Sequence, residues 1–206
     1  MSQHALARPA LARPGVHLAD ALPGGLARDV LLVLAGTALI VLAAPLTIPL
    51  PFTPVPIALS TFAVFAVGAS LGPLRGVLSA ALYLAIGVAG APVFSGGQSG
   101  VGIPTFGYII GFVIAAAVVG RLASHRADRH VPGTLALGAL GTLAMYACGV
   151  PWLAVSLGIG PREAILLGVV PFLLGDALKV LALAGLLPTA WKLVGALRPE
   201  NAPERR

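Results

Sequence analysis

Charged residues are scarce in this chain of 206 residues: only 10% of its positions are Asp, Glu, Lys or Arg, whereas 58% are hydrophobic. A soluble domain usually carries about 25% charged residues. A tenth of the chain is too little charge to cover the surface of a soluble protein of this length. Disorder is excluded as well, because disordered segments combine low hydrophobicity with high net charge. The composition therefore predicts an integral membrane protein with one compact domain.

Several chemical groups are missing or nearly so. The single cysteine, Cys148, excludes an internal disulfide and a cysteine-based metal cluster. No G-x-x-x-x-G-K-[ST] motif occurs, so ATP-driven work would need separate ATPase subunits. The net charge of +6 is explained by basic residues in short loops and tails, which attract anionic membrane lipids. They form no motif for nucleic-acid binding. We expect no cofactor, no metal and no catalytic residue.

Long apolar runs predict the helices, because a membrane-spanning helix needs about 20 apolar residues. Runs such as Val30–Val41 do not alternate between apolar and polar residues, as the strands of a membrane barrel do. We therefore predict an all-α integral membrane protein, a bundle of six transmembrane helices. The predicted spans are residues 29–47, 57–71, 74–91, 105–122, 133–155 and 163–187. Only Gly72 and Pro73 separate the second span from the third, so a count that joins or splits them stays open.

The basic residues lie unevenly around these spans. With six spans, eleven of the 13 lysines and arginines fall on the side of the two termini, Arg162 falls on the other side, and Lys179 lies within a span. Because such residues accumulate on the cytoplasmic side, both termini are predicted to be cytoplasmic. The expected organisation in the cell membrane is a flexible tail over residues 1–28, a membrane domain over 29–190 and a second tail over 191–206.

An acidic and a basic residue interrupt the last predicted span. Asp176 and Lys179 are three positions apart, which places them on the same face of a helix. An ionisable group inside a membrane is costly unless it is paired, and such groups usually mark functional sites. We interpret the pair as the floor of a ligand cavity, with Asp176 accepting and Lys179 donating hydrogen bonds. A purely structural ion pair is the alternative.

Two uncharged loops lie on the side opposite the termini. Residues 90–102 contain five glycines, whose backbone can approach a ligand closely, and a helix begins shortly after them. Residues 45–56 contain five prolines, which favour an extended segment that suits a lid. A flexible linker and a rigid connector, respectively, remain the alternatives. Gly107 and Gly111 form a G-x-x-x-G motif, which we interpret as close helix packing within the chain.

Several strings, taken in order, resemble the BioY family over residues 30–187. They are Ile48-Pro-Leu-Pro-Phe-Thr-Pro-Val-Pro-Ile57 followed by Leu59 and Thr61, Leu71-Gly-Pro-Leu-Arg-Gly76, Leu82-Tyr-Leu84, Ala91-Pro-Val-Phe-Ser-Gly-Gly97, Gly107-Tyr108 with Gly111-Phe112, and Asp176-x-x-Lys179. BioY proteins are the biotin-specific S components of energy-coupling factor (ECF) transporters. The resemblance implies a six-helix bundle that binds biotin on its outer side. It also implies partners, namely a transmembrane coupling subunit and ATPase subunits.

The resemblance and the loops together predict the substrate-binding residues. They are Asp176, Lys179, Gly96, Gly97, Gln98, Phe94, Tyr83, Phe52, Thr61 and Tyr108. Two positions depart from the family. Residue 98 is Gln where many members have a basic or small residue, and residue 60 is Ser where Gln is common.

Other functions stay open at this point. An S component for another small vitamin is one, and a scaffold protein is a second. A third is a rhomboid-like intramembrane serine protease, because Gly97-Gln98-Ser99-Gly100 matches a G-x-S-G motif. A serine nucleophile needs a base within hydrogen-bond reach, and the four histidines fall outside the predicted spans. A homo-oligomer is also left open.

Overall fold

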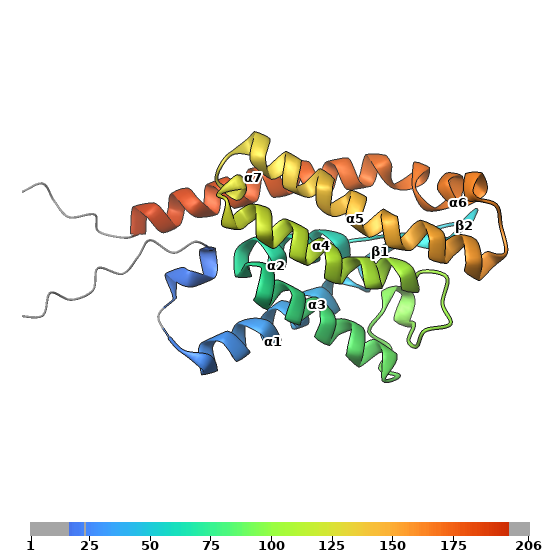
Figure 1. The fold of residues 1–206 in the computed structure, drawn as a ribbon, viewed down its shortest axis with the longest axis horizontal. Helices are drawn as coiled ribbons and strands as arrows, with labels where there is room; N and C mark the ends of the chain where they lie inside the picture. The colour runs from blue at the N-terminus through green and yellow to red at the C-terminus, as the bar shows by residue number, and fades with distance from the viewer. Residues whose placement is uncertain (1–16, 23, 198–206) are drawn as a thin grey trace, which may run out of the picture.

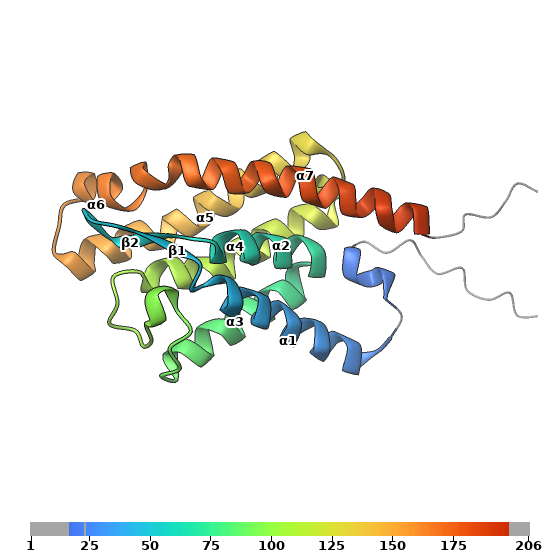
Figure 2. The same ribbon diagram turned by 180° about the vertical axis from the view of Figure 1, so that it is seen from behind.

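The computed structural model describes residues 17–22 and 24–197, which form a bundle of helices running back and forth along one direction (Figures 1 and 2). The helices are α1 (Leu26–Ala43), α2 (Ser60–Leu71), α3 (Pro73–Val88), α4 (Phe106–Ser124), α5 (Val131–Leu157), α6 (Pro161–Gly168) and α7 (Leu173–Leu197). Shorter elements are the 3-10 turns η1 (Leu18–Ala21), η2 (Ser95–Gly97), η3 (Ala127–Arg129) and η4 (Val170–Phe172) and the strands β1 (Thr47–Leu50) and β2 (Thr53–Ala58).

The long helices have the length and composition of membrane spans. Four segments are apolar and long enough to cross a membrane: Leu26–Ala43, Phe106–Ser124, Val131–Leu157 and Pro161–Ala196. The helices α2 and α3 are apolar too, but shorter. Large apolar side chains cover the outside of the bundle, and Leu31 and Leu174 are 66% and 75% exposed. Such a surface suits lipid rather than water, so the chain is a mainly helical membrane protein.

The proline-rich loop differs from the all-α prediction, because it forms a β-hairpin. Strands β1 and β2 pair antiparallel, with Thr47 opposite Ala58 and Leu50 opposite Thr53. Proline holds the backbone extended, and a two-stranded hairpin consists only of edge strands, where a missing N–H does no harm. As a result, α1 ends at Ala43 and α2 begins at Ser60, several residues away from the predicted boundaries.

The last predicted span is also not one continuous helix. The chain leaves α6 at Gly168, passes through η4 and starts α7 at Leu173. Val169 has non-helical dihedral angles, and Pro171 lies within η4, where it supplies no N–H. Because of this break, Asp176 falls in the first turn of α7 rather than in the middle of a span. The same helix continues to Leu197, beyond the predicted start of the C-terminal tail.

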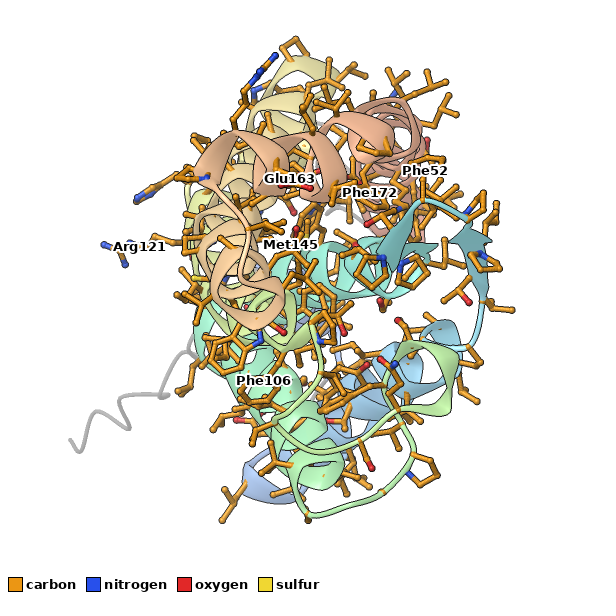
Figure 3. The ribbon with its side chains drawn as sticks, turned by 90° about the vertical axis from the view of Figure 1, so that its right-hand side faces the viewer. Phe52, Phe106, Arg121, Met145, Glu163 and Phe172 are labelled. Atoms are coloured by element: carbon orange, nitrogen blue, oxygen red, sulfur yellow. The ribbon has the colours of Figure 1, made fainter. Side chains whose placement is uncertain are left out.

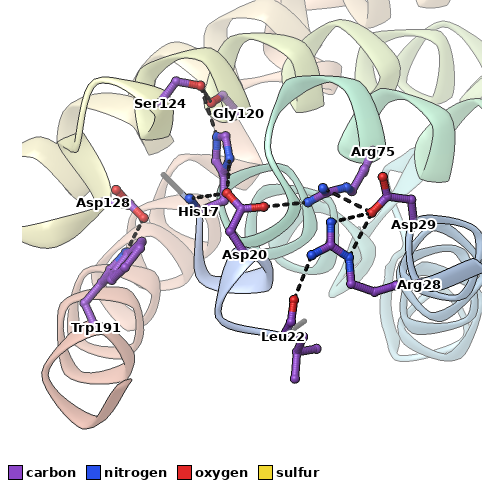
Figure 4. A network of polar contacts seen from close by, with 10 residues as sticks. All are labelled: His17, Asp20, Leu22, Arg28, Asp29, Arg75, Gly120, Ser124, Asp128 and Trp191. Carbon is purple, nitrogen blue, oxygen red and sulfur yellow. Dashed lines mark hydrogen bonds and ion pairs between the residues drawn. The ribbon is translucent and has the colours of Figure 1, made fainter. Parts of the chain in front are cut away.

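A polar network ties the start of the described chain to one end of the bundle (Figure 4). His17 Nε2 lies 3.1 Å from Ser124 Oγ, and Arg75 forms ion pairs with Asp20 (3.0 Å) and Asp29 (3.1 Å). Burial alone raises the pKa of Asp20, but hydrogen bonds from the His17 backbone and from Arg75 outweigh it and hold this pKa below 3.8. Residues 17–22 are therefore packed on the bundle, whereas a flexible tail through residue 28 was expected; residues 1–16 and 198–206 lie outside the described residues.

The two ends of the bundle differ in charge. Helix α1 begins and α7 ends at one end, while the hairpin, the loop before α4 and α6 lie at the other (Figure 1). Among the described residues, the basic side chains on the elements of the terminus-bearing end are Arg28, Arg75, Arg121, Arg126, Arg129 and Lys192. Arg162 is on α6 at the opposite end. Along the bundle, the charge segregation therefore agrees with the prediction.

Close contact between α4 and α5 depends on the G-x-x-x-G motif. A Cβ atom on Gly107 would lie 2.7 Å from the Cys148 carbonyl oxygen, and one on Gly111 would lie 2.8 Å from Met145 Cα. Both distances are too short for a side chain, so the two helices can approach this closely only with glycine here. The interpretation of the motif as packing within the chain is confirmed.

We expect Gly111→Val to lower the free energy of unfolding by about 1 to 3 kcal/mol, because the side chain must push the Met145 backbone away. Thermal unfolding of the detergent-purified protein measures the effect. Gly185→Val is the matched control, since a Cβ at Gly185 in α7 meets no atom within 4 Å. Equal losses of stability in both variants would contradict this account.

Candidate functional site

A hollow of about 550 Å³, counted to its open mouth, lies inside the bundle near the hairpin. Its wall comes from β2, the first turn of α2, α3, η2, α4, α5, η4 and α7. Figure 3 views this end of the molecule and shows Met145 and Phe172, which both line the hollow. Aromatic and aliphatic side chains with a few polar groups share its lining, which is typical of small-molecule sites.

The predicted acid–base pair faces this hollow. Lys179 Nζ lies 2.9 Å from Asp176 Oδ1, and the Tyr146 hydroxyl donates to Asp176 Oδ2 at 2.5 Å. Asp176 is 7% exposed. Its place in the first turn of α7 adds the positive end of the helix dipole to these two donors. A carboxylate buried among apolar side chains is thus held by three favourable interactions, and it still borders the open space.

All three tyrosines of the chain line the hollow. The Tyr108 hydroxyl donates to the Gly168 carbonyl oxygen at 2.9 Å, which satisfies a carbonyl group at the break between α6 and α7. Tyr83 packs edge-on against Phe94, with 5.4 Å between the ring centres, and stacks on Phe112 with 30° between the ring planes. The sequence reasoning had missed Tyr146. Its position inside an apolar run, in a chain with so few tyrosines, was the available signal.

The structure separates the predicted site residues into two groups. Those that line the hollow are Asp176, Lys179, Thr61, Tyr83 and Tyr108. Those that do not are Phe52, Phe94, Gly96, Gly97 and Gln98. Other polar residues of the lining were not predicted, namely Ser60, Ser95, Thr105 and Tyr146.

The glycine-rich loop is folded back on itself, which explains why most of it stays outside the hollow. The Phe94 backbone N–H donates to the Gln98 carbonyl at 3.0 Å, and the Gly100 N–H donates to the Gly87 carbonyl at 2.9 Å. Phe94 is only 1% exposed, and its ring fills the space that a side chain at Gly87 would need. Gly96, Gly97 and Gln98 are therefore exposed, while the Phe94 ring packs against Tyr83.

The hairpin forms one wall of the hollow. Val55, Pro56 and Ala58 of β2 line it, and Thr53 Oγ1 donates to the Leu167 carbonyl of α6 at 2.9 Å. Phe52, in the turn between the strands, is 58% exposed (Figure 3). Because side chains alternate along a strand, Thr53 and Val55 are buried while Pro54 is exposed. Strand β2 therefore lines the hollow, whereas Phe52 does not, and the lid and the rigid connector both stay open.

The serine of the protease-like motif has no histidine at its own end of the bundle among the described residues. Ser99 lies in the loop before α4, at the hairpin end of the bundle. The described histidines are His17 beside η1, His125 after α4 and His130 before α5, all on elements of the opposite end. His4 lies outside the described residues. In the part of the chain that the structure describes, no three His, Cys, Asp or Glu side chains come together to hold a metal.

We expect Lys179→Met alone to cost about 3 to 5 kcal/mol of stability, because it leaves a buried carboxylate without its cation. Adding Asp176→Asn to the same protein should recover part of that loss, since the unpaired charge disappears. Thermal unfolding of the ligand-free single and double variants measures the coupling. Lys192→Met, on the exposed part of the same helix, is the control and should have little effect. Purely additive losses would show that the two side chains do not interact.

Comparisons with known proteins point to one family. Residues 12–196 match the model of the BioY family. The chain is 39% identical to the biotin transporter BioY of Rhodobacter capsulatus over 148 residues, which cover 65% of this chain and 76% of the relative. It is 39% identical to the biotin transporter BioY of Thermotoga maritima over 151 residues, 72% of this chain and 86% of the relative.

A solved structure shares the fold. The S-component for biotin from an ECF-type ABC transporter superposes with a TM-score of 0.71, at 23% sequence identity. The match covers 82% of this chain and 95% of the other. At this level of identity the likeness concerns the fold.

Proposed function

Because this chain belongs to the BioY family, we propose that it is the substrate-binding subunit of a biotin uptake system. It captures biotin in the hollow beneath the hairpin and delivers it to the cytoplasm together with ATP-driven coupling subunits. It does so without a cofactor and without chemical change of the ligand. The observation that carries the proposal is the buried Asp176–Lys179 pair at the edge of an apolar hollow.

The polar groups of the hollow match the chemistry of biotin. Biotin carries a neutral ureido group with two N–H donors and one carbonyl acceptor, fused to an apolar sulfur-containing ring. Asp176 can accept from a ureido N–H, and Lys179 and the Tyr83 hydroxyl can donate. The rings of Tyr83, Phe112 and Phe172 offer apolar surface to the rest of the molecule. The ion pair has no net charge, which suits a neutral ligand group.

We further propose that the chain crosses the cell membrane six times, with both termini in the cytoplasm. Six helices alternate in direction along the bundle, and α2 with α3 would form the two shorter crossings beside the long spans. The basic side chains described at the terminus-bearing end support a cytoplasmic position for that end. The mouth beneath the hairpin then faces outward.

The partners follow from what the chain lacks. It has no phosphate-binding loop motif, so the energy of ATP hydrolysis must come from separate ATPase subunits through a coupling membrane protein. Similarity to the solved S-component for biotin from an ECF-type ABC transporter supports this assembly. Membrane lipids surround the exposed leucines of the outer surface.

Isothermal titration of biotin into the detergent-purified protein tests the function directly. We expect binding to the wild type and at least about tenfold weaker binding to Asp176→Asn and Lys179→Ala, since each loses a hydrogen bond to a charged group. Lys192→Ala, on the same helix but away from the hollow, should bind like the wild type. Unchanged biotin affinity in both variants would contradict the assignment of Asp176 and Lys179 to the binding site. If the wild type gives no heat of binding, biotin is not the substrate, and other small vitamins would be titrated next.

Cysteine labelling in intact cells tests the orientation. In a Cys148→Ser background, we expect Glu163→Cys to react with a membrane-impermeant maleimide from outside, because α6 lies beside the mouth. His125→Cys, which is also exposed but lies at the other end, should react only after the cells are permeabilised. The reverse pattern would overturn the proposed orientation.

A further inference from the structure

One polar side chain of the hollow has a fully buried hydroxyl without a hydrogen-bond partner among the described residues. Ser60 is 1% exposed and lines the hollow, yet its Oγ forms no hydrogen bond within the described residues. A buried hydroxyl without a partner costs about 1 to 3 kcal/mol, so such groups are rare in native structures. Neither the ion pair nor the tyrosines of the site use this hydroxyl. It is available to a bound molecule.

The backbone around Ser60 adds further donors. Ser60, Thr61 and Phe62 occupy the first turn of α2, where the N–H groups have no acceptor within the helix. The neighbouring N–H groups are satisfied, since Leu59 donates to Leu46 and Ala63 donates to Leu59. The first turn contains no acidic residue, and no side chain caps the helix. The positive end of the helix dipole is thus open toward the hollow beside an unpaired hydroxyl.

These donors suit a neutral oxygen better than a carboxylate. Among the residues that the structure describes, Lys179 is the only basic side chain that lines the hollow, and it is already paired with Asp176 at 2.9 Å. A carboxylate placed beside Ser60 would therefore be buried without a free cation, which is far more costly than burying a carbonyl oxygen. Asp176 meanwhile supplies an acceptor to the same space. Donors on one side and an acceptor on the other are what a ureido group requires.

On the basis of the proposed function, we propose that Ser60 and the first turn of α2 bind the ureido carbonyl oxygen of biotin, while Asp176 accepts from a ureido N–H. Ser60 is then a specificity-determining residue, which distinguishes ligands with an acceptor at this place from those with a donor. The assignment is specific to this chain, because it depends on a serine at position 60.

The test combines variants of the protein with analogues of the ligand. Titration calorimetry measures biotin, its guanidino analogue 2-iminobiotin, in which a nitrogen replaces the carbonyl oxygen, and biotin amide, which lacks the carboxylate. We expect Ser60→Ala to weaken the binding of biotin and of biotin amide by about 5- to 10-fold. Its affinity for 2-iminobiotin should not fall. Ser60→Thr, which keeps the hydroxyl, should bind biotin within about twofold of the wild type.

A matched control separates binding from structure. Ser79 is also fully buried, but its Oγ is hydrogen-bonded to the carbonyl groups of Val33 and Arg75, and it does not line the hollow. Ser79→Ala should lower the thermal midpoint of the ligand-free protein and leave biotin affinity unchanged. Ser60→Ala should behave in the opposite way, because it removes a hydroxyl that has no partner in the ligand-free protein.

The possible outcomes are distinct. Wild-type affinity of Ser60→Ala for biotin would overturn the role of Ser60 and leave the proposed function intact. A loss that appears with biotin but not with biotin amide would also overturn it, because the contact would then be made to the carboxylate. Failure of the wild type to bind biotin would overturn the proposed function itself, together with this assignment.

Discussion

The site depends on keeping one carboxylate, that of Asp176, inside an apolar bundle. Lys179 and Tyr146 contact its two oxygens, and the first turn of α7 lies beneath it. A buried charge is tolerated only where such partners are arranged in advance. The arrangement needs the chain to end α6 and begin a new helix just before Asp176, so a local break in the helix determines where this carboxylate lies.

That break is supported from elsewhere in the bundle. The Tyr108 hydroxyl of α4 satisfies the Gly168 carbonyl, and Thr53 of the hairpin satisfies the Leu167 carbonyl. Both carbonyl groups belong to the end of α6, where helices leave their acceptors unpaired. The hairpin and the break therefore stabilise each other, and the wall of the hollow is continuous from β2 to α7. We expect movement of the hairpin to be coupled to α6 through the contact at Thr53.

Sequence reasoning predicted part of the lining of the hollow from residues that are rare in their surroundings. Asp176 and Lys179 were predicted because a charged residue inside an apolar span is costly and usually functional. Both line the hollow. Gly96, Gly97 and Gln98 were predicted because they lie in the uncharged, glycine-rich loop. Hydrogen bonds fold this loop so that the three residues are exposed and do not line the hollow. Tyr146 and Ser60 were not predicted as site residues, because local sequence does not show that separate helices bring them to the same hollow as Asp176.

The length of the apolar runs by itself determined that this is a helical membrane protein, because hydrophobic burial depends mainly on residue type. The charged residues within the last run indicated polar groups in the last helix, because the cost of burying a charge also depends mainly on residue type. Only the tertiary structure decided that the proline-rich loop pairs as a hairpin, that the last span breaks before Asp176, and that Ser60 lines the hollow with its hydroxyl unpaired. These features depend on hydrogen bonds and packing between segments far apart in the chain, such as Thr53 with Leu167, and local sequence patterns do not contain them.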